Sequence, residues 1–295
     1  MPFHLPPSDV LTRRRFLAGL AAGAAAAVVP RRLIAAAAAP PVWALLADTH
    51  INEDPDKHER GSTMSVNLRA ALAEVAAVSP AGVVIAGDFA HHWGKPADYR
   101  VALDILDPFR RQGLGFHMAL GNHDHRENFR AALGESDDGA VEGKRVSAFL
   151  ADGVHWLFLD SLEEVNKSPG ALGDAQRRWL AGRLDARPDV PAIIVLHHNI
   201  EDKPGSLTDS PAFLDVLRPR RQAKAVFFGH THWYGRREVD GLHLVNLPPT
   251  GYVFSPKPPL GWVRAELYPD RMDIELRSLD PTHPKHGRRE TLAWR

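Results

Sequence analysis

The chain has 295 residues, with 36 basic and 36 acidic side chains, so its formal net charge is zero. That balance argues against a dedicated nucleic-acid-binding protein, which usually carries a basic excess. The chain has no cysteine, which excludes disulfide bonds and any metal site with a thiolate ligand. About 255 residues follow the first forty, enough for one large α/β domain.

The first predicted element is an export signal over residues 1–39. Arg13-Arg14-Arg15 gives a twin-arginine pattern, and the apolar run from Ala18 to Val29 is too short to span a bilayer comfortably. Small residues from Ala35 to Ala39 supply Ala-x-Ala cleavage sites. The pattern resembles the signals of proteins exported already folded. It implies the twin-arginine export machinery as a partner, a periplasmic or extracellular location and no permanent membrane anchor. An uncleaved anchor and an amphipathic helix are the alternatives.

Five short apolar runs after this segment predict buried strands. They span residues 42–47, 82–86, 115–120, 192–196 and 225–228. Each run is followed at its C-terminal end by Asp, His or Asn. Because ligands of α/β sheets bind at the carboxyl ends of the strands, we expect these polar residues to meet at one site.

Helices are predicted between these strands, where apolar residues recur with helical spacing. Their expected ranges are 67–78, 98–112, 128–133, 174–184 and 211–217. The second half is richer in hairpins, which we expect at 147–159, 236–245 and 262–276. The final residues, 281–295, read as a polar tail. This pattern alone predicts only an α/β fold.

The polar residues after the strands form an ordered series of motifs. In chain order they are Asp48-Thr49-His50, Gly87-Asp88, Gly121-Asn122-His123-Asp124, His197-His198 and Gly229-His230-Thr231-His232. This order resembles the calcineurin-like metallophosphoesterase superfamily, over residues from about 42 to 278. The resemblance implies a four-layer α/β/β/α sandwich of two mixed sheets with helices outside. It also assigns residues 40–280 to a catalytic domain.

The resemblance further implies two metal ions bound by seven side chains. One ion would take Asp48, His50, Asp88 and His232, and the other Asp88, Asn122, His197 and His230. A carboxylate can bridge two cations, which an imidazole cannot, so Asp88 is the expected bridge. Oxygen and nitrogen ligands without sulfur suit Mn, Fe, Zn or Co. Two such ions clamp a phosphate and lower the pKa of a bridging water, which makes a metal-bridging hydroxide the expected nucleophile.

His123 and Asp124 are the catalytic candidates. His123 is not an expected ligand, so it is available to bind the phosphate or to protonate the leaving oxygen. Asp124 is expected to orient His123 or a metal ligand, with a cap for the next helix as the alternative.

Two further histidines, His198 and His91, are close in sequence to expected ligands. His198 is the rival of His197 as a ligand, and the resemblance favours His197. His91 follows the expected bridge Asp88. A solvated loop residue is the favoured interpretation of His91, with substrate contact beside Asn122 and His123 as the alternative.

Departures from family patterns narrow the expected substrate. Purple acid phosphatases place a tyrosine three residues after the bridging Asp, where this chain has His91. Ser/Thr protein phosphatases carry Gly-Asn-His-Glu, where this chain has Asp124 in the last position. Cyclic-nucleotide and glycerophosphodiester phosphodiesterases look closest, although they often continue the fourth motif as His-His-Pro-Pro. Here that stretch is His197-His198-Asn199-Ile200.

We therefore predict a metal-dependent phosphoric ester hydrolase that cleaves phosphodiester bonds of a small molecule. The first alternative is a phosphomonoesterase or nucleotidase on the same site. Lys95, Arg126 and Lys203 are the cations that would hold the extra charge of a monoester. The second alternative is a non-catalytic, metal-binding scaffold.

Overall fold

The structure is a computed structural model that describes residues 39–134 and 140–295. The export signal predicted over residues 1–39 lies outside the described residues, apart from Ala39. Within the described ranges, no helix combines the length and the apolar character needed to cross a bilayer.

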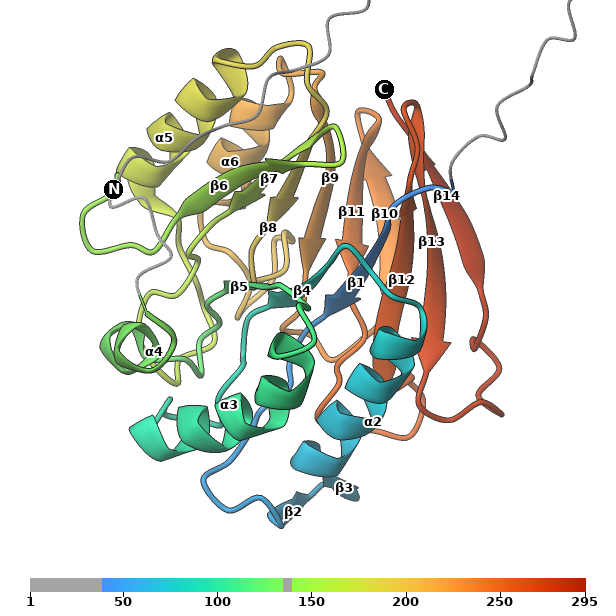
Figure 1. The fold of residues 1–295 in the computed structure, drawn as a ribbon. Helices are drawn as coiled ribbons and strands as arrows, with labels where there is room; N and C mark the ends of the chain where they lie inside the picture. Colours follow the sequence, from blue (N-terminus) through green and yellow to red (C-terminus); the bar gives the residue numbers. More distant parts are fainter. Residues whose placement is uncertain (1–38, 135–139) are drawn as a thin grey trace, which may run out of the picture. The chain divides into compact units, whose positions relative to one another are not determined.

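Residues 40–295 contain two six-stranded mixed sheets (Figure 1). The first has the order β14-β13-β12-β1-β4-β5. Its strands are β1 (Val42–Leu46), β4 (Gly82–Ala86), β5 (Phe116–Ala119), β12 (Gly261–Leu267), β13 (Arg271–Ser278) and β14 (Arg289–Ala293). Strands β1, β4 and β5 are parallel, and β12 joins β1 in antiparallel register.

The second sheet has the order β10-β11-β9-β8-β7-β6. Its strands are β6 (Ser147–Ala151), β7 (Val154–Phe158), β8 (Ala192–Val195), β9 (Ala223–Phe228), β10 (Gly235–Val239) and β11 (Leu242–Asn246). Strands β7, β8, β9 and β11 are parallel, and β6 and β10 close the edges as antiparallel hairpin partners. A small hairpin of β2 (His58–Glu59) and β3 (Ser62–Thr63) stands apart from both sheets.

Helices cover the outer faces of both sheets (Figure 1). The helices are α2 (Met64–Ala77), α3 (Pro96–Arg110), α4 (Arg126–Leu133), α5 (Gly173–Asp185) and α6 (Ser210–Leu217). The side chains of α2 and α3 pack on the first sheet, and those of α5 and α6 pack on the second. The predicted four-layer α/β/β/α sandwich is therefore confirmed.

Strand β1 shows why the sequence gives these layers. Successive side chains of a strand point to opposite faces, and both faces of β1 are buried. Trp43 and Leu45 join the core between the two sheets, where the ring of Trp43 lies 4.5 Å from that of Trp156. Ala44 and Leu46 point the other way, into the core beneath α2 and α3. A continuous apolar run is thus needed at this position.

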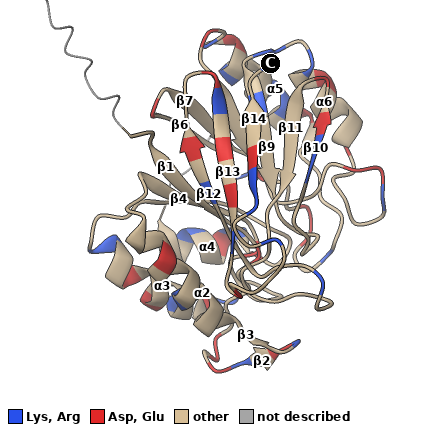
Figure 2. Cartoon of the chain, turned by 90° about the vertical axis from the view of Figure 1, so that its right-hand side faces the viewer, with Lys and Arg blue, Asp and Glu red and all other residues tan. Residues whose placement is uncertain are grey.

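The C-terminal segment differs from the expectation of a polar tail over 281–295. Strand β14 pairs with β13 in antiparallel register, and Leu292 is buried between the sheets. Figure 2 shows acidic and basic bands along β13, where charged residues alternate with buried Met272, Ile274 and Leu276. An edge strand with one buried apolar side chain has too weak an alternation to be predicted, so β14 was missed.

The carboxyl ends of the parallel strands in both sheets meet at one place. The backbone amide of Asp48, after β1, donates to the carbonyl of Gly87, after β4. The amide of Gly229, after β9, donates to the carbonyl of His197, after β8. A Cβ at Gly229 would meet the carboxylate of Asp48, so the two sheets approach each other closely here. This junction holds the predicted motifs.

Candidate metal centre

Five of the seven predicted ligands have a backbone φ angle in the left-handed region. The φ angles are 52° at Asp48, 48° at His50, 49° at Asp88, 73° at His230 and 52° at His232. This conformation costs an ordinary L-residue roughly 1–2 kcal/mol. This conformational cost is present at all five positions. The sharp turns that it permits direct the five side chains to one centre.

Gly121 is required by close packing. A side chain at Gly121 would meet the carboxylate and the backbone nitrogen of Asp88. In addition, the backbone amide of His123 donates to Asp88 Oδ1 over 2.8 Å. The motif over residues 121–124 therefore packs directly against Asp88 and fixes the orientation of its carboxylate.

The first group of converging side chains contains Asp48, His50 and His232. The Nε2 atoms of His50 and His232 are 3.0 Å apart. Asp48 Oδ1 lies 3.6 Å from His232 Nε2 and 4.0 Å from His50 Nε2. Asp88 Oδ2 lies 3.7 Å from His50 Nε2. All four residues are buried, and three of them have the spacing of a metal-ion site.

The second group contains Asp88, Asn122, His197 and His230. His197 Nε2 lies 3.2 Å from each of three atoms, namely Asp88 Oδ2, Asn122 Oδ1 and His230 Nδ1. The same oxygen, Asp88 Oδ2, therefore faces both groups. The structure thus brings together the seven predicted ligands in the two expected sets, with Asp88 between them.

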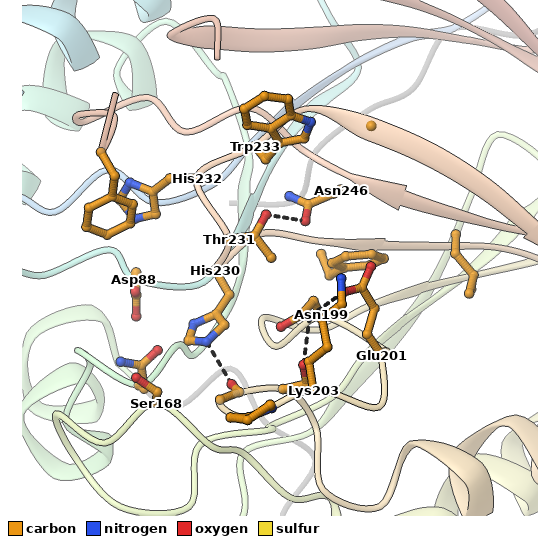
Figure 3. A pocket seen from close by; sticks show the side chains of 18 of the residues that line it. Asp88, Ser168, Asn199, Glu201, Lys203, His230, Thr231, His232, Trp233 and Asn246 are labelled. Atoms are coloured by element: carbon orange, nitrogen blue, oxygen red, sulfur yellow. Dashed lines mark hydrogen bonds and ion pairs between the residues drawn. The ribbon is translucent and has the colours of Figure 1, made fainter. Parts of the chain in front are cut away.

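Three of the histidines have one ring nitrogen bonded to a backbone carbonyl, which leaves the other nitrogen available to a metal ion. His232 Nδ1 faces the carbonyl of Tyr252 at 2.7 Å, and His197 Nδ1 faces that of Ala86 at 2.9 Å. His230 Nε2 faces the carbonyl of Gly205 at 2.9 Å, drawn as a dashed line in Figure 3. A carbonyl oxygen can only accept, so each of these nitrogens donates. In its neutral form each ring then directs a lone pair into the centre, as a metal ligand must.

The charges of the centre also favour a cation. Burial lowers the pKa of His230 to about 3 and that of His232 to about 4, so both rings are neutral at pH 7. Burial raises the pKa of Asp48 to about 7. Burial would also neutralise Asp88, but the nearby His197 and His123 hold the Asp88 pKa well below its usual range.

His197 carries the compensating charge in the protein alone. Burial disfavours its charged form, yet Asp88 outweighs burial and raises the pKa of His197 to about 9. A bound cation would take over this role and release the proton from His197 Nε2. The residues present therefore fit divalent metal ions.

His123 lies beside these groups without joining them. Its Nδ1 donates to the carbonyl of His92 over 3.0 Å, which fixes the ring. Its Nε2 lies 4.0 Å from Asp88 Oδ2, and the residue lines the adjoining cavity. This position leaves Nε2 free to meet a substrate, as the predicted catalytic role requires.

Asp124 does not orient the ring of His123, which was the first of the roles predicted for it. Its side chain is fully buried, and none of its hydrogen bonds reaches the ring of His123. It is also not the cap of the next helix, because His125 accepts from the Asn128 amide at the start of α4.

Instead, Asp124 joins two motif loops. Its Oδ2 accepts from the backbone amides of Phe89, at 3.2 Å, and Gly121, at 2.9 Å. Its Oδ1 accepts from the amide of Ala90, at 3.0 Å, and from the hydroxyl of Tyr99, at 3.1 Å. Asp124 is thus a positioning residue that holds the loop after β4 against the loop after β5.

His91 is neither the solvated loop residue favoured from the sequence nor placed for substrate contact. It is buried, and neither ring nitrogen is free. The amide oxygen of Asn52 accepts from the Asp54 backbone, so the Asn52 amide nitrogen donates to His91 Nδ1 at 3.0 Å. His91 Nε2 therefore donates to Glu59, also at 3.0 Å. His91 ties the β2–β3 hairpin to the loop that carries Asp88.

His198 lies outside both groups of ligands. Its Nδ1 is 2.8 Å from Ser161 Oγ, and that oxygen also accepts from the backbone amides of His197 and His198. Ser161 therefore fixes the turn that directs His197 inward. No motif in the sequence pointed to Ser161 or Tyr99, and the ring-orienting carbonyls carry no side-chain pattern at all.

A cavity of about 650 Å³ opens from the centre (Figure 3). Asp88, Asn122, His123, His230 and His232 lie at its metal-facing end. The loop over residues 199–206 forms another wall. A substrate of moderate size can therefore reach the centre from this side.

The family described as calcineurin-like phosphoesterase matches residues 43–234. The chain belongs to this family. The prediction of a phosphoric ester hydrolase is confirmed at this level, and the matched range contains every predicted metal ligand.

Among curated relatives, a probable cyclic nucleotide phosphodiesterase of Synechococcus is 28% identical over 81% of this chain and 94% of its own length. The 3′,5′-cyclic adenosine monophosphate phosphodiesterase CpdA of Haemophilus influenzae is 26% identical over 78% of this chain and 87% of its own. A dimetal phosphatase from Danio rerio has the same fold, with a TM-score of 0.70 and 18% identity over 87% of this chain and 100% of that chain.

Proposed function

We propose that the chain hydrolyses phosphodiester bonds of a small anionic substrate at a binuclear metal centre. The observation that carries this proposal is the position of Asp88 Oδ2, which faces both groups of ligands. Two bound ions, of Mn, Fe, Zn or Co, would polarise the phosphoryl group and lower the pKa of a water. The names of the relatives, which are phosphodiesterases, support this reaction class.

The roles of the residues follow from their positions. Asp48, His50 and His232 would hold one ion, and Asn122, His197 and His230 the other, with Asp88 shared. His123 would bind the phosphate and protonate the leaving oxygen from Nε2. Because its Nδ1 already donates to the carbonyl of His92, this proton transfer requires the ring to carry a proton on both nitrogens.

The positions of three cations favour a diester over a dianionic monoester. Lys95 is paired with Glu53 at the surface. Arg126 is bonded to Asp160, with its Nε 2.7 Å from that carboxylate. Lys203 does line the cavity, but it forms an ion pair with Glu201 at 2.8 Å. None of the three is an unpaired cation aimed at the ligands, which is what a second phosphate charge would need.

Export through the twin-arginine machinery is a second part of the proposal. It rests on Arg13-Arg14 and on the Ala-x-Ala sites that end at Ala39. A fusion of residues 1–45 to a reporter that is active only after export tests it. Replacement of Arg13 and Arg14 by Lys should abolish export of that reporter, and unchanged export would contradict the assignment.

The catalytic proposal is tested with bis(4-nitrophenyl) phosphate against 4-nitrophenyl phosphate, with Mn-loaded protein. Preferential turnover of the diester, lost in both Asn122→Ala and His123→Ala, is the expected result. Preference for the monoester would favour the phosphatase alternative. Bound metal without turnover of either substrate would favour the scaffold alternative.

A further inference from the structure

Two aromatic rings are exposed at the mouth of the cavity. Among the described residues, five large apolar side chains are strongly exposed, and two of them, Trp233 and Phe254, line this cavity. Trp233 is 45% exposed and Phe254 is 58% exposed. Single exposed apolar residues are common, but two large rings at the opening of a catalytic cavity indicate a surface that contacts a ligand.

Both rings lie next to a proposed metal ligand. Trp233 directly follows His232, and Figure 3 shows both at the cavity. The ring centroid of Phe254 is 4.5 Å from that of His232. A group attached to a phosphate at the metal centre would therefore reach these rings without leaving the cavity.

Each ring also carries a cation. The guanidinium carbon of Arg60 lies 4.7 Å from the ring centroid of Phe254, and Lys285 Nζ lies 5.3 Å from that of Trp233. Arg60 is also paired with Glu59, whose Oε1 lies 3.8 Å from Arg60 Nε, so the positive charge of this rim comes mainly from Lys285. Cations that rest on aromatic rings attract an anion, while the remaining ring surface stays available for stacking.

The ligand that matches this rim is anionic and has a planar aromatic part. A small alkyl diester would leave the exposed rings without a partner, whereas a nucleobase would cover them. A cavity of about 650 Å³ is also within the range of roughly 300–1,000 Å³ that is typical of small-molecule sites.

We propose that Trp233 and Phe254 form a stacking subsite for the base of a nucleotide whose phosphoester lies at the metal centre. This inference rests on the proposed function, because it places the phosphate there. Lys285 assists by attracting the anion, and Arg60 packs on the ring of Phe254. The subsite recognises a base by stacking and not by hydrogen bonds to its edges. Purine and pyrimidine nucleotides therefore both bind.

The test compares AMP with ribose 5-phosphate, which has the same sugar and phosphate but no base. Dissociation constants for both are measured by calorimetry on the Mn-loaded protein. AMP should bind at least about fivefold more tightly than ribose 5-phosphate, because stacking on aromatic side chains supplies that much per base. In the double variant Trp233→Ala/Phe254→Ala the two ligands should bind equally.

Two control variants separate stacking from folding. Trp233→Phe keeps a ring beside His232 and should retain most of the preference for AMP. Leu150→Ala removes an equally exposed apolar side chain, which is 50% exposed on β6 outside the cavity, and should leave the preference unchanged. Measured Mn content should be the same in all variants.

The failures of the two proposals are distinguishable. Turnover of a diester together with equal binding of AMP and ribose 5-phosphate in the wild type would overturn the subsite and keep the proposed function. A preference for AMP that survives in the double variant would also overturn the subsite. Selective AMP binding, lost in that variant, without turnover of any diester would keep the subsite and overturn the proposed function.

Discussion

Asp124→Asn should damage the metal centre although Asp124 touches no proposed ligand side chain. Each oxygen of Asp124 accepts two hydrogen bonds, Oδ2 from Phe89 and Gly121, and Oδ1 from Ala90 and Tyr99. An amide nitrogen in place of Oδ2 turns two acceptor contacts into contacts between donors. In place of Oδ1 it does so only toward Ala90, because the hydroxyl of Tyr99 can turn and accept. A hydrogen bond to a charged group contributes about 1.5–3 kcal/mol, so the loss of one or two bonds costs about 1.5–6 kcal/mol.

The assay is urea denaturation of the metal-free protein, which gives the free energy of unfolding without the contribution of bound ions. Tyr99→Phe is the matched control. It removes one of the four donors to Asp124, together with the hydrogen bond from the His125 amide to the Tyr99 hydroxyl, and it should leave metal binding unchanged. The Asp124→Asn variant should also bind metal less tightly, because the loops that carry Asp88 and Asn122 lose their common anchor. Unfolding within 1 kcal/mol of the wild type, with full metal binding, would refute this reasoning.

Three further variants test separate contacts. His123→Ala should lower kcat by about a hundredfold or more while metal content, measured by plasma mass spectrometry, stays unchanged; loss of metal would instead make His123 a ligand. Gly205→Ala should weaken one metal site in a calorimetric titration, because Gly205 has φ 86° and its carbonyl orients His230. Gly153→Ala, at φ 75° in the β6–β7 turn, is its control and should cost a similar strain of roughly 1–2 kcal/mol without any effect on metal binding. Burial opposes ionisation of Glu275, but hydrogen bonds from Arg277 and Arg289 outweigh it and hold its pKa below 4.5. A lowered carboxyl pKa stabilises the folded state above the unfolded pKa, and this stability is lost as the pH falls through the folded pKa. Glu275→Gln should therefore lower the free energy of unfolding by about 1–3 kcal/mol at pH 7. The variant should also lose less stability than the wild type as the pH falls below about 4.5. Identical acid unfolding curves for the two proteins would contradict the ion-pair account.

The strand pattern was sufficient to place the polar motif residues at one site for a physical reason, whereas the four layers and the two ligand sets came from the family resemblance. Buried parallel strands need continuous apolar runs, and the residue after each run lies at the shared edge of the sheets. Asp48, Asp88 and His197 could thus be placed from the strand pattern and the motif order. The bounds of α2 and α3 were off by two or three residues because the predicted starts ignored the first helical turn.

The misassigned residues depend on contacts that no local pattern encodes. Asp124 looked catalytic because it adjoins His123, yet its partners are backbone amides of a different loop. His91 looked exposed because its loop is polar, yet Glu59 and Asn52 enclose it. Every residue has a backbone carbonyl, so the sequence does not indicate that the carbonyl of Gly205 orients His230. Only the structure could identify this contact.

The most direct test of the central claim is the turnover of bis(4-nitrophenyl) phosphate during stepwise addition of Mn²⁺ to the metal-free protein. If Asp88 is shared between two ions, activity should rise until two equivalents are bound and then level off. The Asn122→Ala variant, which lacks a ligand of one site only, should bind its second equivalent much more weakly and stay nearly inactive. Full activity at one equivalent, or no diester turnover at any loading, would contradict a binuclear phosphodiesterase.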